Sequence, residues 1–109
     1  MSRLQFQIGD QIFGVGFRAE NAYLIVTGEI ELFADDGTGK RTLRVAGKGE
    51  LVGDIDVLAG RDYSEYAVAK RNTEVLKIER RIFFEAIDQS PKLLQASLRK
   101  LIQQYVDSR

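Results

Sequence analysis

Residues 53–69 read GDIDVLAGRDYSEYAVA, and this stretch decides how the chain is interpreted. Gly53 and Gly60 bracket a run that suits one short helix, with Asp54 expected as the N-cap and Gly60 as the end. The last four residues of the stretch are apolar or aromatic and predict a strand. The stretch therefore predicts a short helix, a charged loop and the start of a strand.

Before this stretch, short apolar runs alternate with glycine turns. Such a pattern is typical of a small β-sandwich or roll and predicts about eight short strands. Ile30 and Leu32 are expected on one buried face, and Leu43 and Val45 are expected to point inward from the next strand. The clearest strands are predicted over 11–15, 22–26, 29–33, 41–46, 66–69 and 75–78.

The apolar period changes after residue 79. Over 80–88 the apolar residues recur at helical spacing, which predicts one helix. Ser90 and Pro91 then suit the N-cap and first turn of a second helix that runs to Asp107. The apolar stripe of this second helix consists of Leu94, Leu98, Leu101 and Tyr105.

This stripe suits either of two contacts, because its spacing fits packing on the chain's own strands and packing on a second copy. We favour a homodimer, since a small chain without an output domain acts through some contact. The whole pattern predicts one α+β domain, mainly β, over residues 1–109. It comprises an antiparallel β-roll, jelly-roll-like and barrel-shaped, over about 6–79 and two C-terminal helices over about 80–107, with no DNA-binding domain.

Composition restricts the function classes. The chain has 109 residues with neither cysteine nor histidine, which excludes disulfides, thiolate or imidazole metal sites and a Ser-His-Asp triad. We therefore expect a protein that is not an enzyme and has no metal or catalytic cofactor. No signal peptide or membrane span is apparent, and we expect a cytoplasmic protein without membrane contact.

Charge is balanced overall but unevenly distributed. Sixteen basic and sixteen acidic residues cancel, so nucleic acid is not an expected partner. Residues 50–66 hold five acids and one base, Arg61, and Asp54 and Asp56 are interpreted as loop polarity rather than an acid–base pair. The basic run, interpreted as a solvated strand face, consists of Lys40, Arg41, Arg44 and Lys48.

The order of these elements resembles the cyclic nucleotide-binding domain, the sensor domain of catabolite activator-type regulators, cyclic nucleotide-dependent kinases and gated channels. The resemblance covers residues 6–107. The segments that carry it are 6–13, Gly16, 22–32, 49–55 and 75–80. It implies a sensor-type module in which residues 53–69 are the phosphate-binding cassette.

In that family a Gly-Glu pair opens the cassette helix, an arginine binds the cyclic phosphate, and small residues follow. The resemblance therefore implies that the amides of Gly53 to Ile55 face an anion, with Asp54 at the glutamate position. Tyr63 stands at the arginine position and Ser64 follows it, while Arg61 lies two residues earlier. Tyr63 is a neutral donor that lacks the cationic fork of arginine.

Two further acids stand in the cassette where the family has small residues, namely Asp56 and Glu65. We interpret Tyr63 and Tyr66 chiefly as residues that cover a sheet, with stacking on a flat ligand as the alternative.

We expect a non-catalytic regulatory domain that has lost strong cyclic nucleotide binding and acts by self-association or by docking on another protein. The alternative is a sensor that binds cAMP, cGMP or another anion, with Arg61 replacing the missing arginine.

Overall fold

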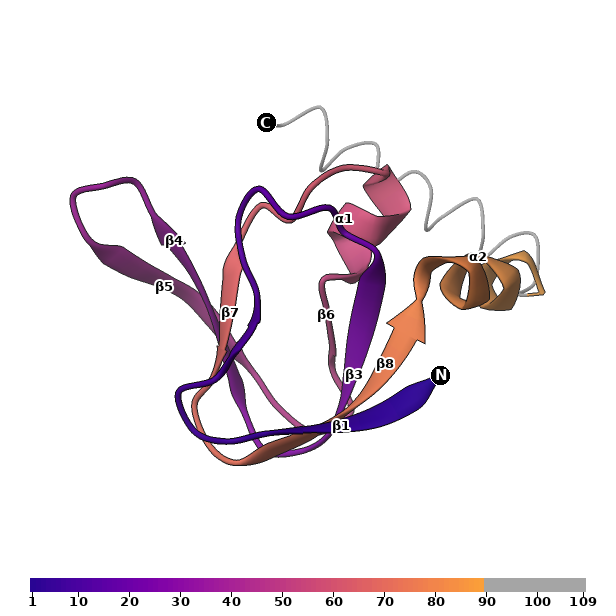
Figure 1. Cartoon of the computed structure of the whole chain (residues 1–109), viewed down its shortest axis with the longest axis horizontal. Coiled ribbons are helices and arrows are strands. Elements are labelled where there is room, and N and C mark those ends of the chain that lie inside the picture. Colours follow the sequence, from indigo (N-terminus) through magenta and orange to yellow (C-terminus); the bar gives the residue numbers. More distant parts are fainter. Residues whose placement is uncertain (90–109) are drawn as a thin grey trace.

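The computed structural model describes residues 1–89. In this part of the chain a short helix interrupts a series of strands, and a second helix follows the last strand (Figure 1). In chain order the elements are β1 (Ser2–Phe6), β2 (Gln11–Phe13), β3 (Asn21–Thr27), β4 (Ile30–Asp35), β5 (Lys40–Ala46), β6 (Leu51–Val52), α1 (Asp54–Ala59), β7 (Tyr66–Ala69), β8 (Thr73–Glu79) and α2 (Arg80–Asp88).

The strands form two four-stranded antiparallel sheets, with the orders β1-β8-β3-β6 and β2-β7-β4-β5. Leu24 lies opposite Leu76 in the first sheet, and Leu32 lies opposite Ala67 in the second. The sheets make a β-roll and do not close into a barrel. The predicted class, α+β and mainly β with about eight strands, is confirmed.

The core unites both sheets and both helices. Ile30 and Leu32 of β4 are fully buried, as their alternation predicts. Val57 of α1 and Phe83 of α2 belong to the same apolar cluster. A fully buried side chain of this size contributes about 1.5–3 kcal/mol relative to exposure, so these two residues anchor the helices to the roll.

The inward orientation predicted for Leu43 and Val45 is wrong. Their side chains are 45% and 39% exposed, and Ala46 is the buried residue of β5. The cause is tertiary, since β5 is the outer strand of its sheet and the β4–β5 hairpin projects away from the rest of the fold (Figure 1). A register shift between Leu32 and Phe33 also interrupts the pairing of this hairpin.

Two strands lie outside the predicted set. β1 begins at Ser2, before the predicted start of the roll at residue 6, and it pairs with β8. β6 has two residues and pairs with Tyr23 and Leu24 of β3. Strands with so few alternating apolar residues are difficult to predict from the sequence. Each of these two forms because it pairs with a central strand that is distant in the sequence.

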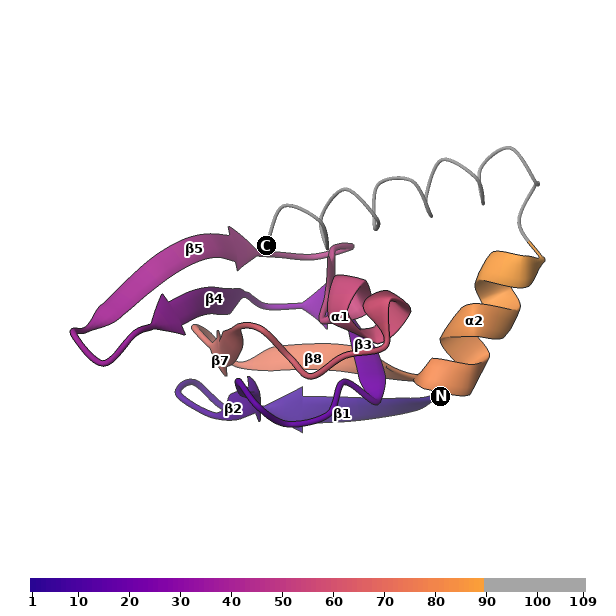
Figure 2. The same ribbon diagram turned by 90° about the horizontal axis from the view of Figure 1, so that it is seen from above.

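The helix predicted over 80–88 is confirmed as α2. Figures 1 and 2 place α1 between the β4–β5 hairpin and α2. The predicted helix after Ser90 and its stripe of Leu94, Leu98, Leu101 and Tyr105 lie outside the described residues. The organisation of residues 1–109 as a single domain stays a prediction.

Candidate ligand-binding cassette

Gly53 sets the direction of the cassette helix. It follows β6 and occupies the N-cap position of α1 with φ of 76°. A Cβ atom placed there would lie 3.1 Å from Cε1 of Tyr63 and 3.2 Å from Cε2 of Phe13. Glycine therefore meets two requirements at once, a left-handed backbone and close contact with an aromatic pair.

The prediction that Asp54 caps this helix is wrong by one residue. Asp54 is the first helical residue, and the N-cap is Gly53, which offers no side-chain hydrogen bond. The predicted end at Gly60 is confirmed, because Gly60 is the C-cap with φ of 68°. Its N–H donates to the Val57 carbonyl at 3.1 Å, which closes the last turn.

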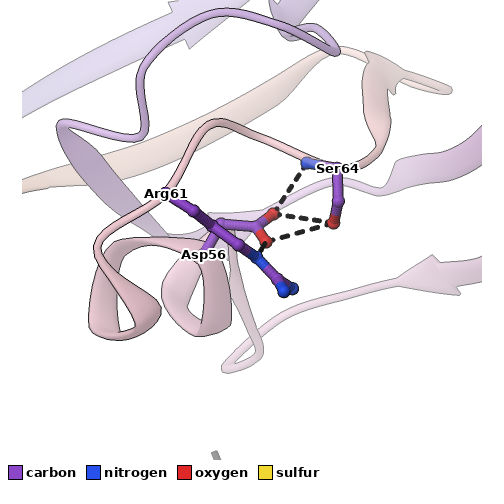
Figure 3. A network of polar contacts seen from close by, with 3 residues as sticks. All are labelled: Asp56, Arg61 and Ser64. Atoms are coloured by element: carbon purple, nitrogen blue, oxygen red, sulfur yellow. Dashed lines mark hydrogen bonds and ion pairs between the residues drawn. The ribbon is translucent and has the colours of Figure 1, made fainter. Parts of the chain in front are cut away.

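Asp56 is the central polar group of the cassette (Figure 3). Its side chain is buried at 7% exposure, and its Oδ1 atom accepts a hydrogen bond from Nε of Arg61 at 2.7 Å. Its Oδ2 atom accepts from the Ser64 N–H at 3.0 Å, and the Ser64 hydroxyl lies 3.1 Å from both carboxylate oxygens. The interpretation of Asp56 as loop polarity is therefore wrong, since it is a buried helical residue that holds the following loop.

Arg61 is directed at Asp56 by its side chain and by its backbone. The Arg61 N–H donates to the Asp56 carbonyl at 3.2 Å, while the guanidinium forms the ion pair described above. The Arg61 carbonyl accepts from the Ala19 N–H at 3.3 Å. In this arrangement Arg61 serves an internal contact of the cassette.

Tyr63 packs into the core. Its side chain is 5% exposed and stacks on Phe13, with ring centroids 4.1 Å apart and planes 13° apart. Its hydroxyl donates to the Asn21 carbonyl at 2.6 Å and accepts from the Asn21 N–H at 3.3 Å. Burial raises the pKa of the Tyr63 phenol, so Tyr63 remains a neutral residue of the core.

The loop that follows Arg61 is held by the segment between β2 and β3. The Tyr63 N–H donates to the Phe17 carbonyl at 2.8 Å, and the Tyr63 carbonyl accepts from the Gly16 N–H at 3.3 Å. Arg18 and Asp62 form an isolated antiparallel bridge. These backbone contacts orient Tyr63 inward and bring Ser64 to the Asp56 carboxylate.

A pocket of about 140 Å³ lies beside the start of α1. Its lining includes the acidic residues Asp54, Asp56 and Glu65 and the basic residue Arg44. Pockets for drug-sized ligands usually have volumes of roughly 300–1,000 Å³. This pocket is therefore small, and its charged lining residues in the described part of the chain are three acids and Arg44, whose guanidinium donates to the Leu51 carbonyl at 3.4 Å.

Burial raises the pKa of the Asp54 carboxyl above its usual range. Hydrogen bonds from the amides of Asp54 and Ile55 and the charge of Arg44 act in the opposite direction. A nucleotide phosphate would add negative charge beside this carboxyl, which is already incompletely solvated. The geometry thus favours a neutral or cationic neighbour at Asp54 over an anionic one.

Larger hollows lie outside this pocket. One of about 390 Å³ is lined by β2, the segment after it, Asn21 and Tyr23 of β3, and Tyr63 of the cassette. Another, of about 400 Å³, is formed near the end of β1 and the β7–β8 turn, and Glu74 is its single charged lining residue among those described. Residues 1–89 contain no group of three side chains suited to hold a metal ion. The helices of this same part of the chain are too short or too polar to cross a membrane.

Of the residues predicted for the site, the structure brings Arg61 and Ser64 together around Asp56, and it places Gly53 against Tyr63. Tyr63 faces the core, and Tyr66 stacks on Phe33 at 5.3 Å between ring centroids. The interpretation that these two tyrosines cover the roll agrees with this packing.

Three contributors to the site lie outside the sequence-based candidates. Phe13 and Asn21 hold Tyr63, and Arg44 reaches the pocket from the basic run on β5. Phe13 belongs to one of the segments that carry the family resemblance, so the sequence offered a reason to place Phe13 near the cassette. No local pattern connects Asn21 or Arg44 to the cassette.

Residues 3–90 match the family described as Cyclic nucleotide-binding domain. The match spans most of the chain, and the chain belongs to this family. The resemblance inferred from the cassette and its flanking segments is confirmed.

Two curated relatives illustrate the range of proteins that contain such a domain. The chain is 30% identical over 107 residues to lysophospholipase NTE1 of Pyricularia oryzae, covering 91% of this chain and 7% of that protein. It is 34% identical over 84 residues to the cyclic AMP receptor protein of Thermus thermophilus, covering 76% of this chain and 39% of that protein. The chain thus spans less than half of either relative.

Solved structures agree on the fold. The cGMP-bound form of the EAL enzyme Bd1971 aligns with a TM-score of 0.87 at 18% identity, covering 95% of this chain and 28% of that chain. The regulatory subunit of a cAMP-independent protein kinase A from Trypanosoma brucei aligns with a TM-score of 0.78 at 26% identity, covering 98% and 40%. The relatives therefore include regulatory proteins.

Proposed function

We propose that this chain is a non-catalytic regulatory domain of the cyclic nucleotide-binding family in which tight cyclic nucleotide binding has been lost. The observation that carries the proposal is the position of Tyr63. A buried, neutral phenol bonded to Asn21 stands where the family uses an arginine on the phosphate. Loss of one charge-assisted contact costs about 1.5–3 kcal/mol, or roughly ten- to a hundredfold in affinity.

The electrostatics of the pocket support the same proposal. Its lining includes three acidic residues and one basic residue, Arg44. The Asp56 carboxylate is paired with Arg61, so a cyclic phosphate would add its negative charge chiefly beside Asp54 and Glu65. Like charges in a partly buried site repel strongly because water screens them poorly. The Trypanosoma brucei relative is the regulatory subunit of a cAMP-independent protein kinase A, which is a precedent for a regulatory relative in a cAMP-independent enzyme.

Such a domain acts through contact with other chains. We propose self-association through the predicted stripe of Leu94, Leu98, Leu101 and Tyr105, or docking on a protein partner. Sedimentation of the whole chain beside a Leu98→Asp variant tests the first contact. A dimer that Leu98→Asp dissociates into monomers supports it, whereas a monomer at about 100 μM, a concentration far above a micromolar dissociation constant, contradicts it.

The alternative function is a sensor that binds cAMP, cGMP or another anion in the remodelled pocket. Arg44 favours this alternative, because it is the basic residue among the described residues that line the pocket. Loss of anion binding in an Arg44→Ala variant would assign the binding of the anion to Arg44.

We propose the cytoplasm as the compartment of this chain. We do not propose for it the lysophospholipase activity of its longer relative.

Calorimetric titration with cAMP and with cGMP separates the two functions. The proposal predicts no saturable heat up to about 1 mM nucleotide. A dissociation constant below about 10 μM, equivalent to about −7 kcal/mol, would contradict the proposal and favour the sensor.

A further inference from the structure

We propose that the Asp56 carboxylate is a built-in anion of the cassette. It takes the hydrogen-bond donors that would otherwise receive an external oxyanion, and it fixes the cassette in one arrangement without a ligand. This inference rests on the proposed loss of nucleotide binding, and it identifies the contact that blocks the site.

The donors around Asp56 are those that proteins use for oxyanions. A guanidinium from Arg61, a backbone N–H from Ser64 and the Ser64 hydroxyl converge on one carboxylate, at 2.7 to 3.1 Å (Figure 3). Cationic, amide and hydroxyl donors together are a typical set for a carboxylate or a phosphate. Here the chain itself supplies the anion.

Burial makes this contact difficult to exchange. The Asp56 side chain is 7% exposed and the Arg61 side chain is 24% exposed. A carboxylate removed from water needs its partners, and removing them leaves a poorly solvated charge. An external anion at the same donors would therefore have to expel Asp56 or lie beside it against direct charge repulsion.

The contact also links two parts of the cassette. Asp56 lies in α1, whereas Ser64 lies in the loop after α1, two residues before β7 begins at Tyr66. The Arg61 N–H strengthens the link by donating to the Asp56 carbonyl. The helix and the loop are thus joined through one side chain, which is the mechanical task that a bound anion would perform between the same two segments.

The experiment compares wild type, Asp56→Ala and the control Asp36→Asn, titrated with inorganic phosphate at pH 7. Asp36→Asn also removes one carboxylate, but Asp36 lies between β4 and β5, outside the lining of the cassette pocket, and its loss leaves the contacts of Arg61 and Ser64 intact. We expect Asp56→Ala to bind phosphate at least about tenfold more tightly than wild type, and Asp36→Asn to differ from wild type by less than about threefold. We also expect the Ser64 amide of Asp56→Ala to exchange its hydrogen at least about tenfold faster, and added phosphate to slow it again.

Asp56→Asn is the second variant, because its amide keeps the shape of the side chain and removes its charge. If Asp56→Ala fails to fold, a folded Asp56→Asn is expected to show the gain in phosphate binding, and refolding of either variant by about 50 mM phosphate supports the same conclusion. A folded Asp56 variant with the phosphate response of wild type overturns the inference. An equal gain in Asp36→Asn, or Asp56 variants that stay unfolded with and without phosphate, also overturns it.

The two proposals fail in different measurements. Tight cAMP binding by wild type contradicts the proposed function whatever the Asp56 variants do. An unchanged phosphate response in the Asp56 variants contradicts this inference even when wild type binds no nucleotide.

Discussion

The phenolic oxygen of Tyr63 lies 2.6 Å from the backbone carbonyl oxygen of Asn21, inside the core of the roll. The Tyr63 side chain thus makes an internal hydrogen bond that contributes to folding. The Asp56 carboxylate likewise accepts hydrogen bonds from Arg61 and Ser64 within the cassette. We propose that these two internal contacts replace the ligand contacts of the cassette.

Tyr63→Phe should destabilise the domain by about 1–2 kcal/mol. The change removes only the hydroxyl, so the ring still stacks on Phe13 while the Asn21 backbone loses its buried partner. Urea unfolding followed by circular dichroism measures the difference. Tyr66→Phe is the matched control and should change stability by less than about 0.5 kcal/mol. Equal effects of the two changes would show that the Tyr63 hydroxyl has no special role.

Tyr63→Arg should not recover nucleotide binding. The guanidinium would have to enter the space between Phe13 and Asn21, where burial of an unpaired charge typically costs about 3 kcal/mol or more. We expect a lower melting temperature and no cAMP binding at about 1 mM. Saturable binding by this variant would mean that position 63 turns outward freely and that the buried tyrosine is incidental.

Gly53→Ala should cost more stability than Gly49→Ala. Both glycines have positive φ, 76° and 85°, so both substitutions carry the left-handed penalty of about 1–2 kcal/mol. A Cβ at position 49 meets nothing within 4 Å, whereas one at position 53 meets Tyr63 and Phe13. We expect an additional loss of about 1 kcal/mol or more for Gly53→Ala in urea unfolding. Equal losses would show that the aromatic pair yields easily.

Asp54→Asn should stabilise the domain at pH 7. Burial raises the pKa of this carboxyl, so the folded state favours its neutral form and wild type is at a disadvantage above that pKa. The advantage of Asp54→Asn should shrink as pH falls through the folded pKa toward the ordinary aspartate value. Unfolding curves of wild type and variant between pH 7 and about pH 4 measure this trend.

Asp36→Asn provides the control of opposite sign. Hydrogen bonds from the Thr38 side chain and backbone lower the pKa of Asp36, so its carboxylate favours the folded state above the ordinary aspartate pKa. Asp36→Asn should therefore be the less stable protein at pH 7, and the difference should vanish as pH falls through the lowered pKa. A common sign for the two variants would contradict this electrostatic account.

Local rules predicted the parts of the fold that depend on neighbouring residues. The helix over 80–88, the stop at Gly60 and the burial of Ile30 and Leu32 follow from spacing and from glycine conformation. Leu43 and Val45 follow the same alternation yet are exposed, because the projection of the β4–β5 hairpin is decided by tertiary packing. Periodicity predicts which side chains share a face and not what covers that face.

The site was predictable in position and only partly in chemistry. Residues 53–69 identify the cassette, and the family pattern predicts that Tyr63 stands at the arginine position. The burial of Asp56 was not predictable, because its partner Ser64 is eight residues away along the chain and is brought near by backbone bonds to the segment before β3. The several acidic residues of the cassette suggested a solvated loop, but Asp56 is buried and forms an ion pair with Arg61.

The most direct test of the central claim is an NMR titration of the wild-type domain with about 5 mM cAMP, a concentration that reveals even millimolar affinity. We expect the amide signals of Gly53, Asp56, Tyr63 and Ser64 to keep their positions, because we propose that the Asp56 carboxylate already occupies the donors of the cassette. Saturable shifts of these four signals with a dissociation constant below about 10 μM would contradict the proposed loss of tight binding and would favour the cyclic nucleotide sensor.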